Sequence, residues 1–539
     1  MRRAALATIV LLSCPIARRA AAAPQSDLGP ALQALSQKLE SEREKRNLPS
    51  LSVAVVRGRE VVLARAFGFA DLEHKTPATP DRIYPAGSVT KLLVATSLMQ
   101  LVERGVVRLD DPITKYLPEY HVRSPWPETS PATLRQLASH TAGLPRDAPV
   151  NFWMNYSLGA FVVSRGQAPL EWYVSRERLL ETLSTVELDH RPFTDPQYSN
   201  LGMTLLAIAL ERASGQPFPD YVAEHILRPL GLRDSTLAPS DAERRRMPVG
   251  YVFTSNDVPP FVAPEWKLGA AVYTGGLYTT ASDLARFVAA QLPTADGAST
   301  PILKQESLLQ MRAPVGRGEA ALGWWTTEID GRQLIGHTGG HLGFLASVAA
   351  LPELKLGVAV MTNSWNPIVG ADDTWELSKM ALADLAQAAA PSPTPKPPDF
   401  DAASVDLSRY VGRYALPGGF AHVDVDVRNG TLWREVRERP GSGAACAPSG
   451  PDRFSCGLAF HAGEDGRITG LSMALFEFER EEPRPRAGQS AKGATSTEPC
   501  DAPGFKAPPP PPPSPAPVAN PFAGLGEAGC APPPPTKKP

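Results

Sequence analysis

The chain has 539 residues, of which 43% are hydrophobic and 20% are charged, so it can bury a large core. Its 54 basic and 56 acidic residues leave a formal net charge of only -2, so the charge balance gives no indication of a nucleic-acid or polyanionic partner. The length predicts about two to four domains, and many of the 57 prolines are concentrated late in the chain.

The N-terminus is typical of an export signal. Basic residues precede a short apolar segment, Ala4–Leu12, and the run Ala20–Ala23 offers small residues for cleavage. We therefore expect residues 1–23 to be a signal peptide and the protein to leave a bacterial cytoplasm, as a periplasmic, secreted or lipid-anchored protein. The segment ending at Cys14 also resembles a bacterial lipobox, so lipidation of Cys14 and ordinary cleavage are both open.

Residues 27–388 are predicted to form one α/β unit. Strand signals occur near both of its ends and helical signals dominate its middle, which implies a single sheet closed by both ends of the unit. The main signals, in chain order, are a helix over Asp27–Lys45, a hairpin around Arg57–Arg59, a helix ending at Gly215, strands from Gln333 onward and a helix over Asp373–Ala388.

The remainder of the chain is divided by a proline-rich linker, residues 389–400, which is expected to be extended. Residues 401–480 alternate apolar and polar side chains around turns at Asn429-Gly430 and Asp465-Gly466, which predicts a small antiparallel β domain. Residues 481–539 are rich in Pro, Gly, Ala and Ser and are predicted to be disordered.

Four cysteines follow the signal segment, and four allow three pairings. Cys446 and Cys456 flank an expected turn, Pro448–Pro451, between two strand-like segments, so we favour a disulfide between them. An exported protein would meet the oxidising compartment that this bond needs. None of the four cysteines, Cys446, Cys456, Cys500 and Cys530, has metal-ligand spacing.

Ser88 and Lys91 are the first residues with a chemical signature. They lie three residues apart at the start of an apolar helical segment, so they share one face of its first turn. A buried ammonium group needs a partner or a lowered pKa, and a neutral lysine beside a serine can act as the base that activates it. The alternative is a capping serine and a lysine that reaches solvent.

Two further motifs follow in order. Tyr198 and Asn200 form a Y-x-N sequence directly before a predicted helix, where a phenol could exchange protons with Ser88 and an amide could bind a substrate carbonyl or hold Lys91. Asn200 could alternatively be the N-cap of that helix. The third motif, Gly336–Gly340, ends a strand-like run with residues small enough for a substrate backbone to approach.

This order of motifs resembles the serine β-lactamase and penicillin-binding-protein superfamily, and in particular its class C β-lactamase and DD-peptidase-like branch. The resemblance covers about residues 30–388 and is supported by the flanking segments LASHTAGLP and YTGGLYTTASDLARF. It implies an antiparallel sheet flanked by helices, with a helical subdomain. The unit at 401–480 is similar to the small lipocalin-like barrels appended to such enzymes.

The resemblance assigns roles to the nucleophilic side of the site. Ser88 is expected to be the nucleophile that becomes acylated, and Lys91 and Tyr198 are expected to share the general-base work. Which of these two takes the proton of the serine is left open by the sequence. The N–H groups of Ser88 and Gly340 are expected to form the oxyanion hole.

The same resemblance assigns substrate-binding roles to Asn200, His337, Thr338 and Gly339, with His337 and Thr338 facing the substrate carboxylate or its equivalent. The β-lactamases of this superfamily usually carry lysine where this chain has His337. Because histidine is charged only part of the time near neutral pH, this difference argues against efficient β-lactam hydrolysis as the physiological role.

We therefore expect a serine hydrolase that acts through an acyl-enzyme on a D-amino-acid peptide or a small ester. The alternatives are a class C-type β-lactamase and a non-hydrolytic penicillin-binding sensor. No cofactor and no metal are expected, since the spacing of His337 and His341 lacks the glutamate and helix of a zinc motif. The expected partner is a small molecule or cell-wall peptide, with membrane contact only through lipid at Cys14.

Overall fold

The computed structural model describes residues 27–147, 174–193, 196–253, 259–265, 267–294, 299–316, 319–366, 372–390, 402–415, 422–437, 443–450, 452–454, 456, 458–463, 465–473 and 476–481. The predicted signal peptide, residues 391–400 of the predicted linker and residues 482–539 of the predicted tail lie outside these ranges. The chain divides into two compact units, Met1–Glu482 and Pro483–Pro539, and every described element belongs to the first.

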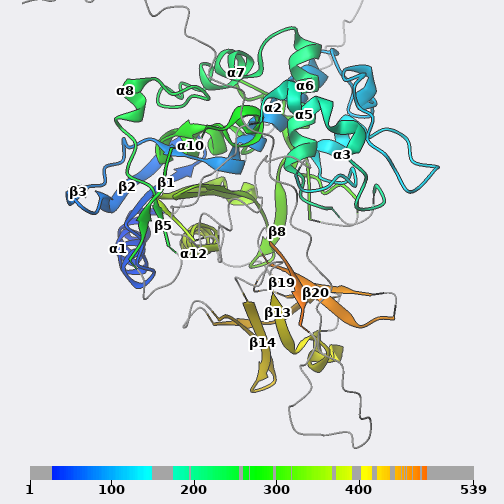
Figure 1. Cartoon of the computed structure of the whole chain (residues 1–539). Helices are drawn as coiled ribbons and strands as arrows, with labels where there is room; N and C mark the ends of the chain where they lie inside the picture. The colour runs from blue at the N-terminus through cyan, green and yellow to red at the C-terminus, as the bar shows by residue number, and fades with distance from the viewer. Residues whose placement is uncertain are drawn as a thin grey trace, which may run out of the picture. The chain divides into compact units, whose positions relative to one another are not determined.

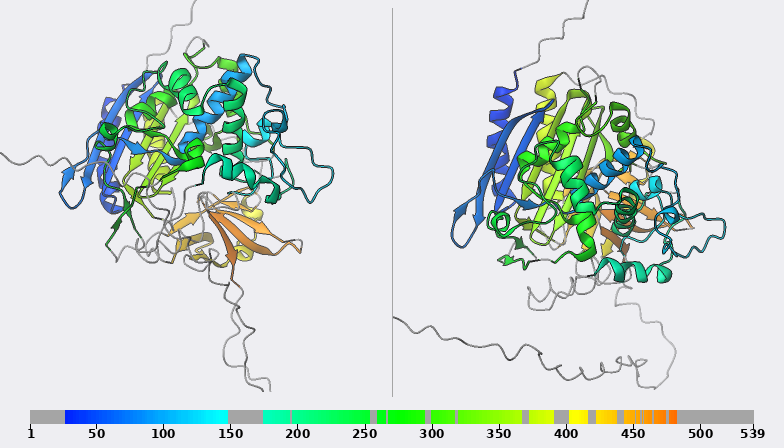
Figure 2. Two further views of the ribbon diagram at one scale, coloured as in Figure 1. Left: turned by 45° about the horizontal axis from the view of Figure 1, so that its top comes forward. Right: turned by 90° about the horizontal axis from the view of Figure 1, so that it is seen from above.

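A seven-stranded antiparallel sheet organises the first part of the chain (Figure 1). Its strands, from one edge to the other, are β3 Thr76–Pro77, β2 Glu60–Asp71, β1 Ser50–Arg57, β11 Leu356–Thr362, β10 Phe344–Leu351, β9 Arg332–His341 and β8 Trp325–Ile329. The predicted hairpin is present, with Gly58 in the left-handed conformation at its turn (φ 61°). Strand β1 pairs with β11 in the centre of the sheet, so the beginning and end of this region lie side by side (Figure 2).

Helices cover both faces of this sheet. On one face, Val53 and Val55 of β1 belong to the core formed with α1 and α12, whereas Ala54 and Val56 belong to the core formed with α2 and α10. Every residue of β10 and β11 is buried, which explains why their sequences are continuous apolar runs instead of alternating ones. The bounds are α1 Gly29–Lys45, α2 Thr90–Glu103, α10 Ala281–Ala290 and α12 Asp372–Ala389.

Among the remaining elements of this region, η1, η4, α6, α7, α9 and α11 pack against α2. The helices and helical turns are η1 Gly87–Val89, η2 Ile113–Lys115, α3 Leu134–Ala138, α5 Arg176–Glu181, η3 Leu183–Thr185, α6 Asn200–Ser214, α7 Phe218–Val222, η4 Ala223–Leu227, α8 Asp241–Arg244, η5 Gly269–Ala271, α9 Val272–Gly275, α11 Gln305–Arg312 and η6 Pro352–Leu354. The small strands are β4 Tyr84–Pro85, β5 Tyr251–Val252, β6 Phe261–Val262, β7 Tyr278–Thr279 and β12 Ser364–Trp365. Helix α6 ends at Gly215, which adopts the left-handed conformation that favours glycine.

The C-terminal part of the described chain is a second antiparallel sheet of nine strands. In sheet order these are β16 Ala444–Cys446, β15 Thr431–Val436, β14 His422–Arg428, β13 Gly412–Ala415, β21 Phe476–Arg480, β20 Ile468–Met473, β19 Leu458–Ala462, β18 Arg453–Phe454 and β17 Pro448–Gly450, preceded by the turns η7 Ala402–Ser404 and η8 Leu407–Tyr410. Both predicted turns, at Asn429-Gly430 and Asp465-Gly466, connect neighbouring strands.

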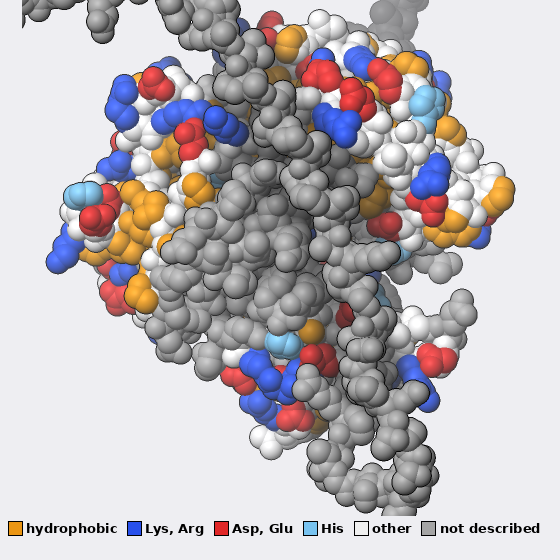
Figure 3. Space-filling model, in the orientation of Figure 1, with side chains coloured by type: hydrophobic (Ala, Val, Ile, Leu, Met, Phe, Trp, Pro, Cys, Tyr) orange, Lys and Arg blue, Asp and Glu red, His pale blue; other side chains and the backbone are white. Residues whose placement is uncertain are grey.

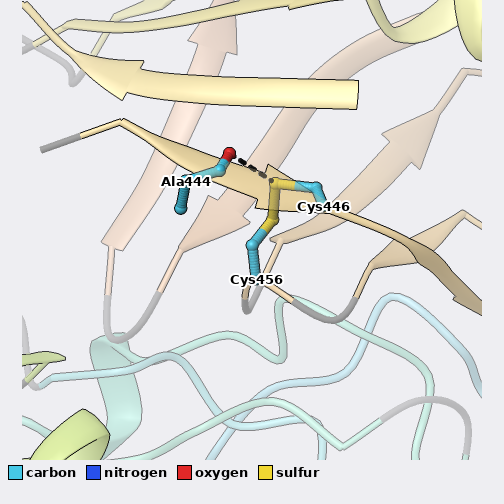
Figure 4. Close-up of a disulfide and its surroundings, with 3 residues drawn as sticks. All are labelled: Ala444, Cys446 and Cys456. Atoms are coloured by element: carbon cyan, nitrogen blue, oxygen red, sulfur yellow. Dashed lines mark hydrogen bonds between the residues drawn. A yellow bond between two sulfur atoms is a disulfide. The ribbon is translucent and has the colours of Figure 1, made fainter. Parts of the chain in front are cut away.

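This second sheet curves until its two ends meet. Strands β16 and β17 stand at opposite ends of the strand order, yet only Ala447 separates them in the sequence. A disulfide joins Cys446 of β16 to Cys456, which follows β18, with their Cα atoms 4.9 Å apart (Figure 4). The turn predicted at Pro448–Pro451 is wrong, because residues 448–450 form β17 and pair with β18.

The described surface carries charges of both signs. On the face drawn in Figure 3, Lys and Arg side chains are interspersed with Asp and Glu side chains, as the balanced composition requires. Within the described ranges, no helix combines the length and the apolarity needed to span a bilayer.

Candidate active site

Ser88 lies in the helical turn η1, which runs directly into α2, and its side chain is almost fully buried. The preceding Gly87 has φ 52°, and a Cβ atom there would lie 2.4 Å from the carbonyl oxygen of Gly340 on β9. Thr90 stabilises the turn by donating a hydrogen bond to the Gly87 carbonyl over 2.6 Å. A glycine is therefore required where the serine turn meets the strand.

Lys91 is completely buried in the first turn of α2, and its Nζ lies 3.0 Å from Ser88 Oγ. The amine also hydrogen-bonds to the carbonyl oxygen of Thr274 in α9, over 3.3 Å. Burial, reinforced by the positive charge of Arg146, holds the pKa of Lys91 well below its usual value, and Asp147 opposes part of that shift. This lowered pKa favours the neutral amine, which is the form that can accept a proton.

Tyr198 approaches Ser88 from the segment before α6. Its phenol hydroxyl donates a hydrogen bond to Ser88 Oγ over 2.7 Å, and Lys91 Nζ lies 4.8 Å from the centre of its ring. Burial raises the pKa of the Tyr198 phenol, although Arg146 and the bond to Ser88 offset part of the effect. The phenol therefore keeps its proton, and Ser88 Oγ lies between this phenol and an amine whose lowered pKa favours its neutral form.

The N-cap of α6 is Ser199, one residue before the alternative position considered for Asn200. Ser199 Oγ accepts the backbone N–H of Gly202 over 2.8 Å and donates to the carbonyl of Pro145 over 2.7 Å. The Asn200 backbone N–H donates to the carbonyl oxygen of Arg146 over 2.8 Å. These bonds fix the loop before residue 147 against the segment that carries Tyr198.

The Asn200 side chain is bonded to a carboxylate that sequence reasoning did not single out. Its Nδ2 donates to Asp147 Oδ1 over 2.9 Å, and its Oδ1 is buried with no partner among the described residues. Lys91 instead makes its hydrogen bonds with Ser88 and Thr274. Asp147 also lies 3.6 Å from Nε of Arg146, whose guanidinium carbon is 5.1 Å from the centre of the Tyr198 ring.

Strand β9 forms the opposite side of the site through its backbone. Its pairing with β8 stops at Gly336, so the following residues have no β8 partner and instead contact η1. A Cβ atom on Gly339 would lie 2.0 Å from the Ala86 carbonyl oxygen and 3.0 Å from the Ser88 amide nitrogen. A Cβ atom on Gly87 would lie 2.8 Å from the Gly340 amide nitrogen. The two amides expected to form the oxyanion hole, those of Ser88 and Gly340, therefore both lie where β9 packs against η1.

His337 occupies the β9 position where a lysine was expected in β-lactamases, and only 2% of it is exposed. Its Nδ1 lies 2.6 Å from the carbonyl oxygen of Thr338, which can only accept, so Nδ1 carries the proton. Burial, followed by the charge of Lys91, lowers the pKa of His337 to about 3. The expectation of a partly charged histidine is therefore corrected, because this imidazole stays neutral.

His140, in the LASHTAGLP segment, supports the position of Tyr198. Its backbone has φ 58°, its carbonyl accepts Gln197 N–H over 2.8 Å, and its Nδ1 accepts Ser199 N–H over 3.1 Å. These two bonds bracket Tyr198, whose ring centre lies 4.8 Å from the imidazole. Burial lowers the pKa of His140 well below its ordinary value, so this ring is also neutral.

Comparison with known proteins identifies the family. The sequence model described as "Beta-lactamase" matches residues 35–383, more than half of the chain.

The chain belongs to the β-lactamase family.

A curated relative from Escherichia coli K12, D-alanyl-D-alanine-carboxypeptidase/endopeptidase AmpH, is 31% identical over 324 residues, which cover 58% of this chain and 78% of the relative. Protein flp from Staphylococcus aureus MW2 is 23% identical over 328 residues, covering 60% of this chain and 61% of that protein.

Solved structures of low sequence identity share the family fold. A β-lactamase/D-alanine carboxypeptidase from Yersinia pestis, determined with citrate, has a TM-score of 0.55 at 24% identity and covers 67% of this chain and 100% of that chain. An octameric penicillin-binding protein homologue from Pyrococcus abyssi has a TM-score of 0.56 at 21% identity, and the match covers 83% of this chain and 99% of that chain. The chain is thus a serine hydrolase with the β-lactamase/transpeptidase fold.

The family motifs account for part of the site only. Ser88, Lys91 and Tyr198 are brought together within hydrogen-bonding distance, and Gly339 and Gly340 meet η1. Thr338 is half-buried beside them. Sequence reasoning missed Thr274, Arg146 and Asp147 as site residues, although Thr274 lies within the family segment YTGGLYTT, and Arg146 and Asp147 directly follow the family segment LASHTAGLP.

Proposed function

We propose that the chain is an exported serine hydrolase that forms an acyl-enzyme on Ser88 with a D-amino-acid peptide or a small ester. The observation that carries this proposal is the position of Ser88 Oγ, 3.0 Å from Lys91 Nζ and 2.7 Å from the Tyr198 hydroxyl. The 31% identity to a carboxypeptidase/endopeptidase supports the choice of a D-amino-acid peptide.

Acylation begins when Ser88 Oγ attacks the substrate carbonyl carbon and the serine proton passes to the Lys91 amine. Lys91 is the better acceptor because its lowered pKa leaves a free lone pair, whereas the raised pKa of Tyr198 keeps the phenol protonated. The carbonyl oxygen becomes an oxyanion that the N–H groups of Ser88 and Gly340 stabilise.

Collapse of the tetrahedral intermediate breaks the bond to the leaving nitrogen or oxygen. That atom takes a proton from Tyr198, and Lys91 returns a proton to Tyr198. A water molecule then attacks the acyl-enzyme by the same route, releases the acid and restores Ser88. Arg146 assists both stages because its positive charge lowers the pKa of Lys91 and of Tyr198.

The export part of the proposal has two supports. The sequence begins with features of a signal peptide, and the described chain contains the Cys446–Cys456 disulfide. Disulfides persist in oxidising compartments such as the bacterial periplasm or the medium. A cell-wall peptide would be accessible to the enzyme in such a compartment.

The proposal is tested by incubating the protein without residues 1–23 with a fluorescent penicillin, D-alanyl peptides, short acyl esters and a chromogenic cephalosporin. We expect covalent labelling by the penicillin and turnover of peptides or esters. Stable labelling with no turnover of any substrate would indicate a sensor, and a cephalosporin kcat/KM above all the others would indicate a β-lactamase. Labelling that persists in Ser88→Ala would contradict the nucleophile assignment.

A further inference from the structure

His337 carries a buried hydrogen-bond acceptor, its Nε2 atom, that has no partner among the described residues. Because its Nδ1–H is used by the Thr338 carbonyl, a neutral ring leaves Nε2 with a lone pair and no proton. Nε2 is buried and has no hydrogen-bond partner in the part of the chain that the structure describes. Buried polar atoms are normally paired, so this acceptor is expected to meet a donor that arrives with the substrate or with water.

The charges around His337 come from several elements. The positive charge of Lys91 on α2 contributes to the lowered pKa of His337. The Tyr198 ring, before α6, has its centre 6.4 Å from that of the imidazole. Arg146 lies over the same tyrosine ring and pairs with Asp147. His140 lies on Tyr198 as well, at 4.8 Å between ring centres. Protonating His337 would bury a positive charge beside Lys91, which itself becomes charged when it accepts the serine proton, so the ring does not readily form the cation that would pair with a carboxylate.

The position of His337 relative to Tyr198 identifies the part of the substrate that it contacts. In the proposed reaction Tyr198 gives its proton to the leaving atom, so the leaving group must lie against the phenol. The His337 ring on β9 has its centre 6.4 Å from that of the Tyr198 ring, and the guanidinium carbon of Arg146 lies 5.1 Å from the same ring centre. We infer that Nε2 of His337, which has no hydrogen-bond partner among the described residues, is the acceptor nearest the group attached to the leaving nitrogen or oxygen.

We propose that His337 selects leaving groups that offer an N–H or O–H donor where a peptide would otherwise carry a terminal carboxylate. A carboxylate has acceptor atoms only and would face the lone pair of Nε2, whereas a backbone amide can donate to it. The preferred substrates are then peptides that continue beyond the cleaved bond, amidated peptides and alcohol esters that carry a donor. This inference rests on the proposed function and narrows its substrate class.

The test compares two substrates with one acyl group, an acyl-D-alanyl-D-alanine and its C-terminal amide, on the protein without residues 1–23. Active sites are first counted by penicillin labelling, so that kcat/KM refers to folded enzyme. We expect the wild type to prefer the amide about tenfold or more, because the amide pairs with Nε2 and the carboxylate does not. In His337→Lys we expect the preference to reverse in favour of the free acid.

A matched control tests whether His337 affects only recognition of the leaving group and not recognition of the acyl group. Two substrates with the same leaving group and different acyl groups are compared in the same two proteins, and their kcat/KM ratio is expected to be unchanged by His337→Lys. The variant His337→Gln, which is neutral and offers both a donor and an acceptor, is expected to lose most of the amide preference without gaining a preference for the acid.

Three outcomes would overturn the inference. One is a wild-type preference for the free acid, including one that disappears in Arg146→Gln, which would identify Arg146 as the carboxylate-binding group. Another is an unchanged preference in His337→Lys, and the third is an equal change in both substrate pairs. Absence of turnover on every peptide and ester would instead contradict the proposed function, so the two failures are distinguishable.

Discussion

The two sides of the candidate site are built in different ways. On the helical side, Ser88, Lys91 and Tyr198 act through side chains that hydrogen-bond to one another over 2.7 and 3.0 Å. On the strand side, β9 contributes backbone amides from glycines packed against η1 and one neutral imidazole. In the proposed function the helical side supplies the nucleophile and the proton transfers, whereas the strand side supplies an oxyanion-hole amide and the imidazole that we propose selects the leaving group.

The largest expected effect is on the helical side. Ser88→Ala removes the attacking atom, and we expect acylation to fall by about a thousandfold or more. Ser97→Ala is the matched control, since Ser97 is a buried serine of α2, the helix that follows η1, and its Oγ donates to the Leu93 carbonyl over 2.9 Å. Similar losses in both variants, measured by penicillin labelling, would show that α2 tolerates no change and would remove the support for Ser88.

Lys91 gives the next effect, and its sign follows from its lowered pKa. The amine accepts a proton only when neutral, so acylation in the wild type should be constant above that pKa and fall as the pH decreases through it. Lys91→Met should lose about a hundredfold or more. Lys91→Arg should remain inactive up to pH 10 because a guanidinium keeps its proton. An active Arg variant would indicate that the charge, and not the base, is needed.

On the strand side, Gly339→Ala should reduce acylation by about tenfold to a hundredfold, because its Cβ would lie 2.0 Å from the Ala86 carbonyl and displace β9 from η1. Gly357→Ala on β11 is the control, since its Cβ would meet the side chains of Val288 and Val56 at 2.6 and 2.9 Å, away from the described site. Both variants should lower the melting temperature, and only the first should lower kcat/KM per labelled site.

A smaller effect concerns pH and the leaving group. With its pKa lowered to about 3, His337 stays neutral down to well below pH 5, so the ratio of amide to free-acid turnover should be flat between pH 5 and pH 8. Titration of Lys91 and Tyr198 affects both substrates and cancels in the ratio. If acid turnover rises selectively below pH 7, the imidazole gains a proton there and the neutral assignment is wrong.

The smallest effect on catalysis is expected from the second sheet. Replacing both Cys446 and Cys456 by alanine removes the bond that joins the two ends of this sheet, at an expected cost of about 2–3 kcal/mol in its unfolding free energy. Protease sensitivity of the C-terminal region reports this loss. Unchanged penicillin labelling would agree with a site confined to the first sheet and its helices. Reduced labelling would indicate that the second sheet also supports the site.

Spacing within one helical turn made Ser88 and Lys91 predictable, because three residues along a helix define a shared face whatever the tertiary structure. The central strands β10 and β11 were also predictable from the sequence, because strands that are buried on both faces are continuous apolar runs. The meeting of Tyr198 with Ser88 depended on family resemblance, because no local rule brings residues so distant in sequence to 2.7 Å.

The rest depended on tertiary contacts that no local pattern encodes. Asp147 is a site residue because its loop is bonded to the start of α6, and Thr274 because its carbonyl reaches Lys91. The charge of His337 depends on a neighbouring carbonyl and on burial next to Lys91, neither of which composition reveals. Strand β17 was mistaken for a turn because proline and glycine also occur in edge strands.

The central pairing of β1 with β11 also determines the order in which the polypeptide can fold during its synthesis. Strand β1 can pair with β11 only after Val360, the partner of Val53, has been synthesised. Before that point β1 can pair only with β2. A growing chain therefore exposes an apolar strand edge of the kind that promotes aggregation. Any product that terminates before Leu356 would keep that edge permanently, so the ribosome must nearly complete the hydrolase unit before its sheet can close.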